Sequence, residues 1–120
     1  MAWGNRKVTV IGGGSWATAL VKILAENAST RVSWWLRDRS DVLHIKKHHH
    51  NPSYLSDVYI NPRRVTAYEN LPAALKGSDD VIFVIPAAFA KEPLKNLDPG
   101  LLKDKLVISA VKGLLPTIIC

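Results

Sequence analysis

The sequence predicts one α/β domain built on a doubly wound parallel sheet, and three observations lead to that fold class. Short apolar runs alternate along the chain with segments of helical periodicity, which is typical of βαβ units. A glycine-rich turn separates the first predicted strand from the first predicted helix. The length of 120 residues suits a single compact domain with a core of its own.

The first βαβ unit is expected between residues 7 and 36. Residues 7–11 form an apolar run that predicts the first strand. Residues 15–27 predict a helix whose apolar face, at i, i+3, i+4 spacing, comprises Trp16, Ala19, Leu20, Ile23 and Leu24. Residues 31–36 are rich in Val and Trp, which predicts a second strand that is buried on both faces.

The remaining elements are shorter. Ser40 and Asp41 can cap a helix that should end before Asn51, because the residue ahead of a proline resists the α conformation. Residues 51–64 show no sustained period and predict a long connection, and such loops are often functional. The later predictions are a strand over 65–67, a helix over 72–76 closed by Gly77, a strand over 81–85, a helix over 88–97 and a strand over 106–110.

The turn over residues 12–17 matches the G-x-G-x-x-A pattern of a dinucleotide-binding loop. Gly12 allows a tight turn, Gly14 lacks the Cβ that would keep the backbone away from a pyrophosphate, and Ala17 lets the helix lie close to the strand. Amide groups at the start of the helix favour an anion. A glycine-rich turn without a ligand is the alternative. The flanking strand and helix favour a nucleotide site in a Rossmann-type sheet with the strand order 3-2-1-4-5.

Arg37 directly follows the second predicted strand, where folds of this type bind the adenine ribose. An acidic residue at that position binds a 2′-hydroxyl, whereas an arginine binds a 2′-phosphate. The guanidinium of Arg37, with Arg39 close by, therefore favours NADP(H) over NAD(H). If Asp38 faces the ribose instead, NAD(H) is accepted as well. A solvated Arg-Asp-Arg turn is the third interpretation.

Charge and composition limit the kinds of binding partner that this chain is expected to have. The formal net charge of +6 suits an anionic small molecule or nucleic acid, but the basic residues are scattered, which argues against nucleic acid. No apolar stretch approaches the roughly 20 residues that span a bilayer, so a cytoplasmic protein is expected. The single cysteine, Cys120, forms no internal disulfide. The consecutive histidines at 48–50 point in different directions on a helix, so no metal site is expected.

Five blocks of this sequence, in order and spacing, resemble the bacterial type of NAD(P)-dependent glycerol-3-phosphate dehydrogenase. They cover residues 12–20, 35–37, 50–55, 84–86 and 109–113. The resemblance spans nearly the whole chain and implies that residues 1–120 are the N-terminal cofactor domain, with the helical substrate domain absent. It implies reversible hydride transfer between NAD(P)H and dihydroxyacetone phosphate, which gives sn-glycerol 3-phosphate for phospholipid synthesis.

The resemblance also implies roles for individual residues. Ser15 and Trp16 would line the pyrophosphate, and Arg37 would meet the adenosine 2′-phosphate. Tyr54 would lie near the cofactor in the long loop. Pro86 would touch the nicotinamide half through its backbone, since alanine follows it where the family has serine.

Lys112 is the residue that the resemblance places against both cofactor and substrate. Valine precedes it where the family has threonine. The family's catalytic lysine and its phosphate-binding arginine belong to the substrate domain, so these 120 residues are expected to bind cofactor without turnover. A homodimer is possible. The alternatives are another Rossmann reductase, such as a ketopantoate-type enzyme, or a nucleotide-binding module without chemistry.

Overall fold

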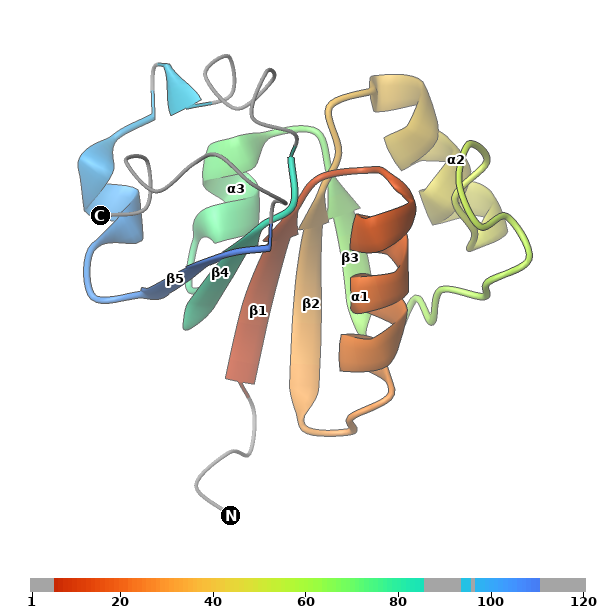
Figure 1. The fold of residues 1–120 in the computed structure, drawn as a ribbon, viewed down its shortest axis with the longest axis horizontal. Helices are drawn as coiled ribbons and strands as arrows, with labels where there is room; N and C mark the ends of the chain where they lie inside the picture. The colour runs from red at the N-terminus through yellow and green to blue at the C-terminus, as the bar shows by residue number, and fades with distance from the viewer. Residues whose placement is uncertain (1–5, 86–93, 96, 111–120) are drawn as a thin grey trace.

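A five-stranded parallel sheet forms the centre of the computed structural model, which describes residues 6–85, 94–95 and 97–110. The strands are β1 (Arg6–Ile11), β2 (Thr30–Trp35), β3 (Val65–Tyr68), β4 (Asp80–Phe83) and β5 (Leu106–Ser109). They pair in the order β3-β2-β1-β4-β5, and every pair is parallel (Figure 1). The predicted fold class and strand order are confirmed.

Helices cover both faces of the sheet, and each face has its own apolar core. Helices α1 (Ser15–Ala25) and α2 (Arg39–His48) pack on one face, in a core that includes Trp34 of β2. Helix α3 (Leu71–Leu75) and the 3-10 helix η1 (Pro99–Leu102) lie on the other face, in a core that includes Trp35. The two neighbouring tryptophans confirm that the second strand is buried on both sides.

Helix α1 presents only part of its predicted apolar face to the sheet. Trp16 and Ile23, which were expected on its apolar face, are each 63% exposed. Leu20 and Leu24 of the predicted face are half-buried and pack against the same core, whereas the small side chains between them let the helix backbone approach the sheet closely. The residues of α1 that are buried are Ala17, Thr18, Val21 and Ala25.

Several predicted boundaries shift by one to three residues. Helix α1 ends at Ala25 because Glu26 is its C-cap, and α3 begins at Leu71 because the Asn70 side chain accepts a hydrogen bond from the Ala73 amide at 2.9 Å. Strand β4 ends at Phe83. The predicted helix over 88–97 falls largely outside the described residues, and η1 was not expected.

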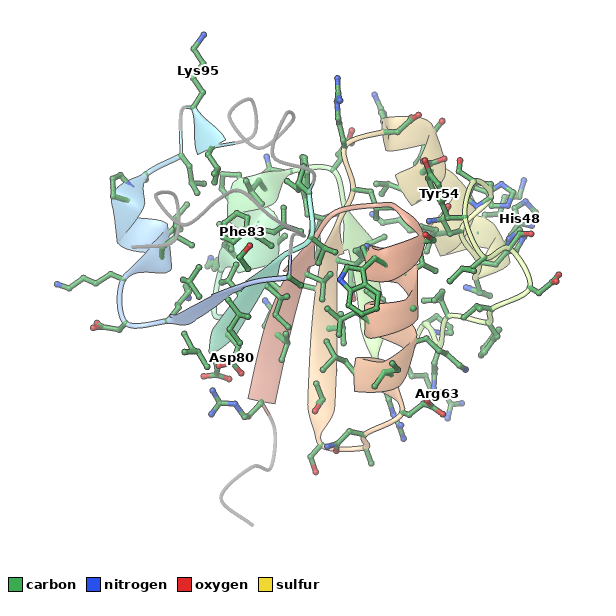
Figure 2. All side chains as sticks on the ribbon, viewed as in Figure 1. His48, Tyr54, Arg63, Asp80, Phe83 and Lys95 are labelled. Carbon is green, nitrogen blue, oxygen red and sulfur yellow. The ribbon has the colours of Figure 1, made fainter. Side chains whose placement is uncertain are left out.

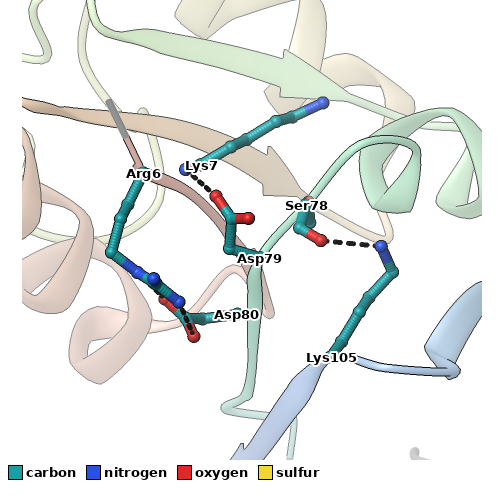
Figure 3. A network of polar contacts seen from close by, with 6 residues as sticks. All are labelled: Arg6, Lys7, Ser78, Asp79, Asp80 and Lys105. Carbon is teal, nitrogen blue, oxygen red and sulfur yellow. Dashed lines mark hydrogen bonds and ion pairs between the residues drawn. The ribbon is translucent and has the colours of Figure 1, made fainter. Parts of the chain in front are cut away.

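A network of polar contacts joins β1, β4 and β5 at the amino edge of the sheet (Figure 3). Arg6 donates to both carboxylate oxygens of Asp80, at 2.9 and 2.7 Å, and this raises the pKa of the guanidinium. Lys105 Nζ donates to the Ser78 carbonyl at 2.7 Å. Figure 2 shows Asp80 and Phe83 at opposite ends of β4, so this network lies far from the carboxyl edge. Within the described ranges, no helix is long and apolar enough to cross a membrane.

Candidate dinucleotide site at the carboxyl edge of the sheet

Gly12 makes the turn off β1, and its backbone requires glycine. Its φ of 145° lies in a region that residues with a side chain rarely adopt. A Cβ at this position would stand 3.0 Å from the carbonyl carbon and oxygen of Val84. Val84 itself is held by a 2.8 Å hydrogen bond from its amide to the Ile11 carbonyl. Gly12 therefore allows β1 and the end of β4 to lie close together where the turn leaves the sheet.

Gly14 lacks a side chain for a different reason. Its φ of −81° and ψ of −172° are ordinary extended values, and a Cβ there would meet no atom of the described residues within 4 Å. Gly14 is also the N-cap of α1, where no side chain caps the helix. Neither backbone strain nor internal packing therefore requires glycine at this position. The open space lies beside the uncapped start of a helix, and this geometry fits the close approach of a pyrophosphate.

The first turn of α1 carries three further predicted site residues. Ala17 is fully buried against the sheet, as the close packing of helix and strand requires. Ser15 is exposed at the first helical position. The indole N–H of Trp16 donates to the Ala110 carbonyl at 3.1 Å. The start of α1 is thus linked to the residue that follows β5.

Arg37 and Asp38 directly follow Leu36 after the end of β2, and the Asp38 side chain caps the next helix. Asp38 is the N-cap of α2: its Oδ1 accepts hydrogen bonds from the Ser40 amide at 2.8 Å and the Ser40 hydroxyl at 2.7 Å. These hydrogen bonds lower the pKa of the Asp38 carboxyl. Arg37 and Arg39 are both exposed, and Arg39 forms an ion pair with Glu69 at 3.5 Å.

The long connection between α2 and β3 is attached to the glycine turn by Asn51. Asn51 is fully buried, and its side-chain amide donates to the Gly13 carbonyl at 3.0 Å. The same side chain accepts hydrogen bonds from the amides of Ser53 and Tyr54. Tyr54 is 49% exposed and lies on the loop beside α2 (Figure 2). Asn51 belongs to one of the blocks that resemble the family, but no sequence pattern assigns it a role.

The histidines of this region form a cluster that includes His44 as well as two members of the 48–50 run. The Nε2 atoms of His44 and His50 lie 3.1 Å apart, and the ring centroids of His44 and His48 are 4.6 Å apart. Desolvation, then repulsion from His48 and His50, lowers the pKa of His44. Among the described residues, no group of three or more ligating side chains is placed to hold a metal ion.

Two predicted site residues, Pro86 and Lys112, lie outside the described residues. The nearest described residues, Ile85 and Ala110, follow the adjacent strands β4 and β5. Ile85 follows β4, and the Ala110 amide donates to the Phe83 carbonyl at 2.8 Å. The structure therefore brings Gly12, Gly14, Ser15, Trp16 and Ala17 to the carboxyl edge, where Arg37 also follows β2. The loop that carries Tyr54 is joined to the turn through Asn51.

The fold and this edge define a class of protein. A parallel sheet in the order 3-2-1-4-5, with a glycine turn entering an uncapped helix at the switch between β1 and β4, is a Rossmann-type dinucleotide-binding domain. Residues 7–118 match the family model for the NAD-dependent glycerol-3-phosphate dehydrogenase N-terminus. The chain belongs to the glycerol-3-phosphate dehydrogenase family, and the resemblance seen in its sequence is confirmed.

Curated relatives and solved structures agree with this assignment. The chain is 35% identical over 108 residues to glycerol-3-phosphate dehydrogenase [NAD(P)+] of Nitratidesulfovibrio vulgaris, covering 90% of the chain and 32% of the relative. It is 36% identical over 111 residues to the Bifidobacterium longum protein of the same name, covering 92% and 33%. The crystal structure of glycerol-3-phosphate dehydrogenase from Coxiella burnetii superposes with a TM-score of 0.75 at 27% identity, covering 92% and 34%. The chain thus spans about a third of the length of the relatives that it matches.

Proposed function

We propose that this chain is a cofactor-binding domain that holds NAD(P)H with its pyrophosphate against the glycine turn. The observation that carries the proposal is the open space at Gly14, beside the uncapped start of α1. When bound, the cofactor supplies the hydride, and the protein positions it. Ser15 and Trp16 would line the pyrophosphate, while Gly12 and Ala17 give the turn its shape.

We further propose a preference for NADP(H). Arg37 would hold the adenosine 2′-phosphate, because a planar guanidinium can make two parallel hydrogen bonds to it. The Oδ1 atom of Asp38 caps α2, and this supports Arg37 rather than Asp38 as the residue that reads the ribose. Tyr54 would lie near the cofactor from the long loop.

For the longer protein, we propose the activity that its relatives' names carry, with hydride transfer between NAD(P)H and dihydroxyacetone phosphate or sn-glycerol 3-phosphate. Lys112 would bind both cofactor and substrate, and Pro86 would touch the nicotinamide half. The 120 residues would form the dinucleotide-binding domain and bind cofactor without turnover. A cytoplasmic location suits a chain with a single cysteine, and a homodimer remains part of the proposal.

The test is a pair of calorimetric titrations with NADPH and NADH, repeated with Arg37→Ala. Loss of the charge-assisted hydrogen bonds should weaken NADPH binding by roughly 1–3 kcal/mol and leave NADH binding nearly unchanged. Arg39→Ala is the matched control, because Arg39 is paired with Glu69. Equal losses for the two cofactors would contradict the role of Arg37. Absence of binding by the unmodified chain would contradict the cofactor site itself.

A further inference from the structure

The three consecutive carbonyl groups of residues 12–14 each accept a hydrogen bond from a fully buried side chain. The donors come from β2, from the long loop and from α1. They are Trp34 Nε1 to Gly12 at 2.6 Å, Asn51 Nδ2 to Gly13 at 3.0 Å and Thr18 Oγ1 to Gly14 at 2.8 Å. Three side chains from separate parts of the chain thus hold one short turn.

These hydrogen bonds fix the direction of the turn's amide groups. In a planar trans peptide, a carbonyl and the N–H of the next residue point in opposite directions. Because the carbonyls point at buried donors, the N–H groups of Gly13, Gly14 and Ser15 point away from those donors. Within the described part of the chain, these three N–H groups donate to no acceptor. Neighbouring amides at a helix start that have no acceptor among the described residues are suited to an anion.

Asn51 links this turn to the loop that carries Tyr54. Its Oδ1 accepts from the Ser53 amide at 2.9 Å and the Tyr54 amide at 3.3 Å, while its Nδ2 also donates to Thr18 Oγ1 at 2.9 Å. Both N–H donors and both lone pairs of the side chain are therefore used. One buried amide holds the start of the loop and the glycine turn in a fixed relation.

We propose that Trp34, Asn51 and Thr18 are positioning residues of the pyrophosphate site. They hold the three peptide planes so that the amides are directed outward before the ligand arrives, and Asn51 also sets the Tyr54 loop against the turn. Pre-organised donors raise affinity because little ordering remains to be done on binding. This inference rests on the proposed function, since it assigns the ligand of the turn as a pyrophosphate.

Trp34→Phe tests the proposal, with Trp35→Phe as a matched control. Both variants lose an indole hydrogen bond to a carbonyl, because Trp35 Nε1 donates to the Glu69 carbonyl at 2.8 Å on the opposite face of the sheet. Calorimetry with NADPH should show a Kd about tenfold higher for Trp34→Phe, the cost of about one lost hydrogen bond. The Kd of Trp35→Phe should stay within about twofold of the unmodified chain. Equal Kd changes in the two variants would overturn the positioning role.

Asn51→Asp adds a readout that a purely structural role would not give. The introduced carboxylate keeps an acceptor for the loop amides but cannot donate to the Gly13 carbonyl, so NADPH should bind at least about tenfold more weakly than to the unmodified chain near pH 8. Burial raises the pKa of that carboxyl, and its protonated form donates again. The ratio of the two Kd values should therefore fall severalfold near pH 5.5. A ratio that does not change with pH would overturn the proposal.

A ligand-free measurement separates this inference from the proposed function. Nitrogen-15 relaxation should give order parameters near 0.85 for the Gly13 and Gly14 amides in the unmodified chain and in Trp35→Phe, and values toward 0.6 in Trp34→Phe. If the unmodified chain binds no NADPH, the proposed function fails, and with it the pyrophosphate role. Unchanged order parameters in Trp34→Phe would overturn the positioning role even where NADPH binds.

Discussion

Gly12→Ala should damage the fold rather than the binding chemistry. The φ of 145° at Gly12 strains any residue with a Cβ, and the new methyl group would stand 3.0 Å from the backbone of Val84. That backbone cannot move away cheaply, because the Val84 amide is bonded to the Ile11 carbonyl at 2.8 Å. Strain and overpacking together should lower the free energy of unfolding by about 2–4 kcal/mol.

Gly14→Ala should weaken NADPH binding and leave the stability of the fold nearly unchanged. The φ of −81° at Gly14 suits alanine, and the methyl group meets no atom within 4 Å. Reduced entropy of the unfolded chain and a poorer N-cap act in opposite directions, so the free energy of unfolding should change by no more than about 1 kcal/mol. The methyl group would nevertheless occupy the approach of the pyrophosphate. NADPH affinity should fall at least about tenfold, or about 1.4 kcal/mol.

Urea denaturation and NADPH calorimetry on the same preparations compare the two variants. Gly14→Ala should unfold like the unmodified chain and bind poorly, whereas Gly12→Ala should unfold at lower urea concentrations. Normal NADPH affinity in Gly14→Ala would refute the argument that the missing Cβ makes room for a ligand. A fully stable Gly12→Ala would refute the strain argument.

Three further predictions concern charged groups. Asp38→Ala should lower the Tm by a few degrees because α2 loses its cap. Since folding lowers the pKa of Asp38, the difference in Tm between the variant and the unmodified chain should be present near pH 7 and should shrink when the melts are measured closer to pH 2. The pKa of His44 is also lowered on folding, so the unmodified chain should lose stability from about pH 7 to pH 5, and melts of His44→Gln should show a shallower slope. Asp80→Asn should lower the Tm by breaking the contact with Arg6, yet calorimetry should give an unchanged NADPH Kd, because this contact lies at the amino edge.

Local patterns predicted the sheet and most of the turn. The apolar run over residues 7–11 and the glycine pattern after it are formed by residues that are adjacent in the sequence. Sequence reasoning could therefore identify β1, the bend at Gly12 and the close packing at Ala17. The place of Arg37 followed from the end of β2 in the same way. The strand order followed from the Rossmann-type sheet that the glycine turn indicates.

The orientation of α1 could not be predicted from its periodicity. The helix carries an apolar stripe with Trp16 and Ile23 and a second stripe of smaller residues, including Ala17 and Val21. Periodicity favours the larger stripe, but the distance between helix and sheet fully buries only the smaller one, while Leu20 and Leu24 pack at its border. That distance is a tertiary property, set by the close approach of the backbones at the glycine turn.

The supports of the turn were missed because they act over long separations. Trp34 lies 22 residues from Gly12, and Asn51 lies 38 residues from Gly13. No spacing rule pairs an indole or an amide with a carbonyl at such separations. The run over residues 31–36 predicts Trp34 only as part of a buried strand, although its N–H group reaches the turn.

The hydrogen bonds of the buried Asn51 side chain indicate why this position holds a polar residue. An apolar residue at 51 would leave the Gly13 carbonyl and the amides of Ser53 and Tyr54 without these partners, and the loss of each part-buried hydrogen bond costs about 1 kcal/mol. The strands pair through their own backbones and need no amide side chain there. Asn51 therefore serves the junction between turn and loop rather than the sheet. The junction of turn and loop, rather than pairing within the sheet, explains why a fully buried position holds asparagine.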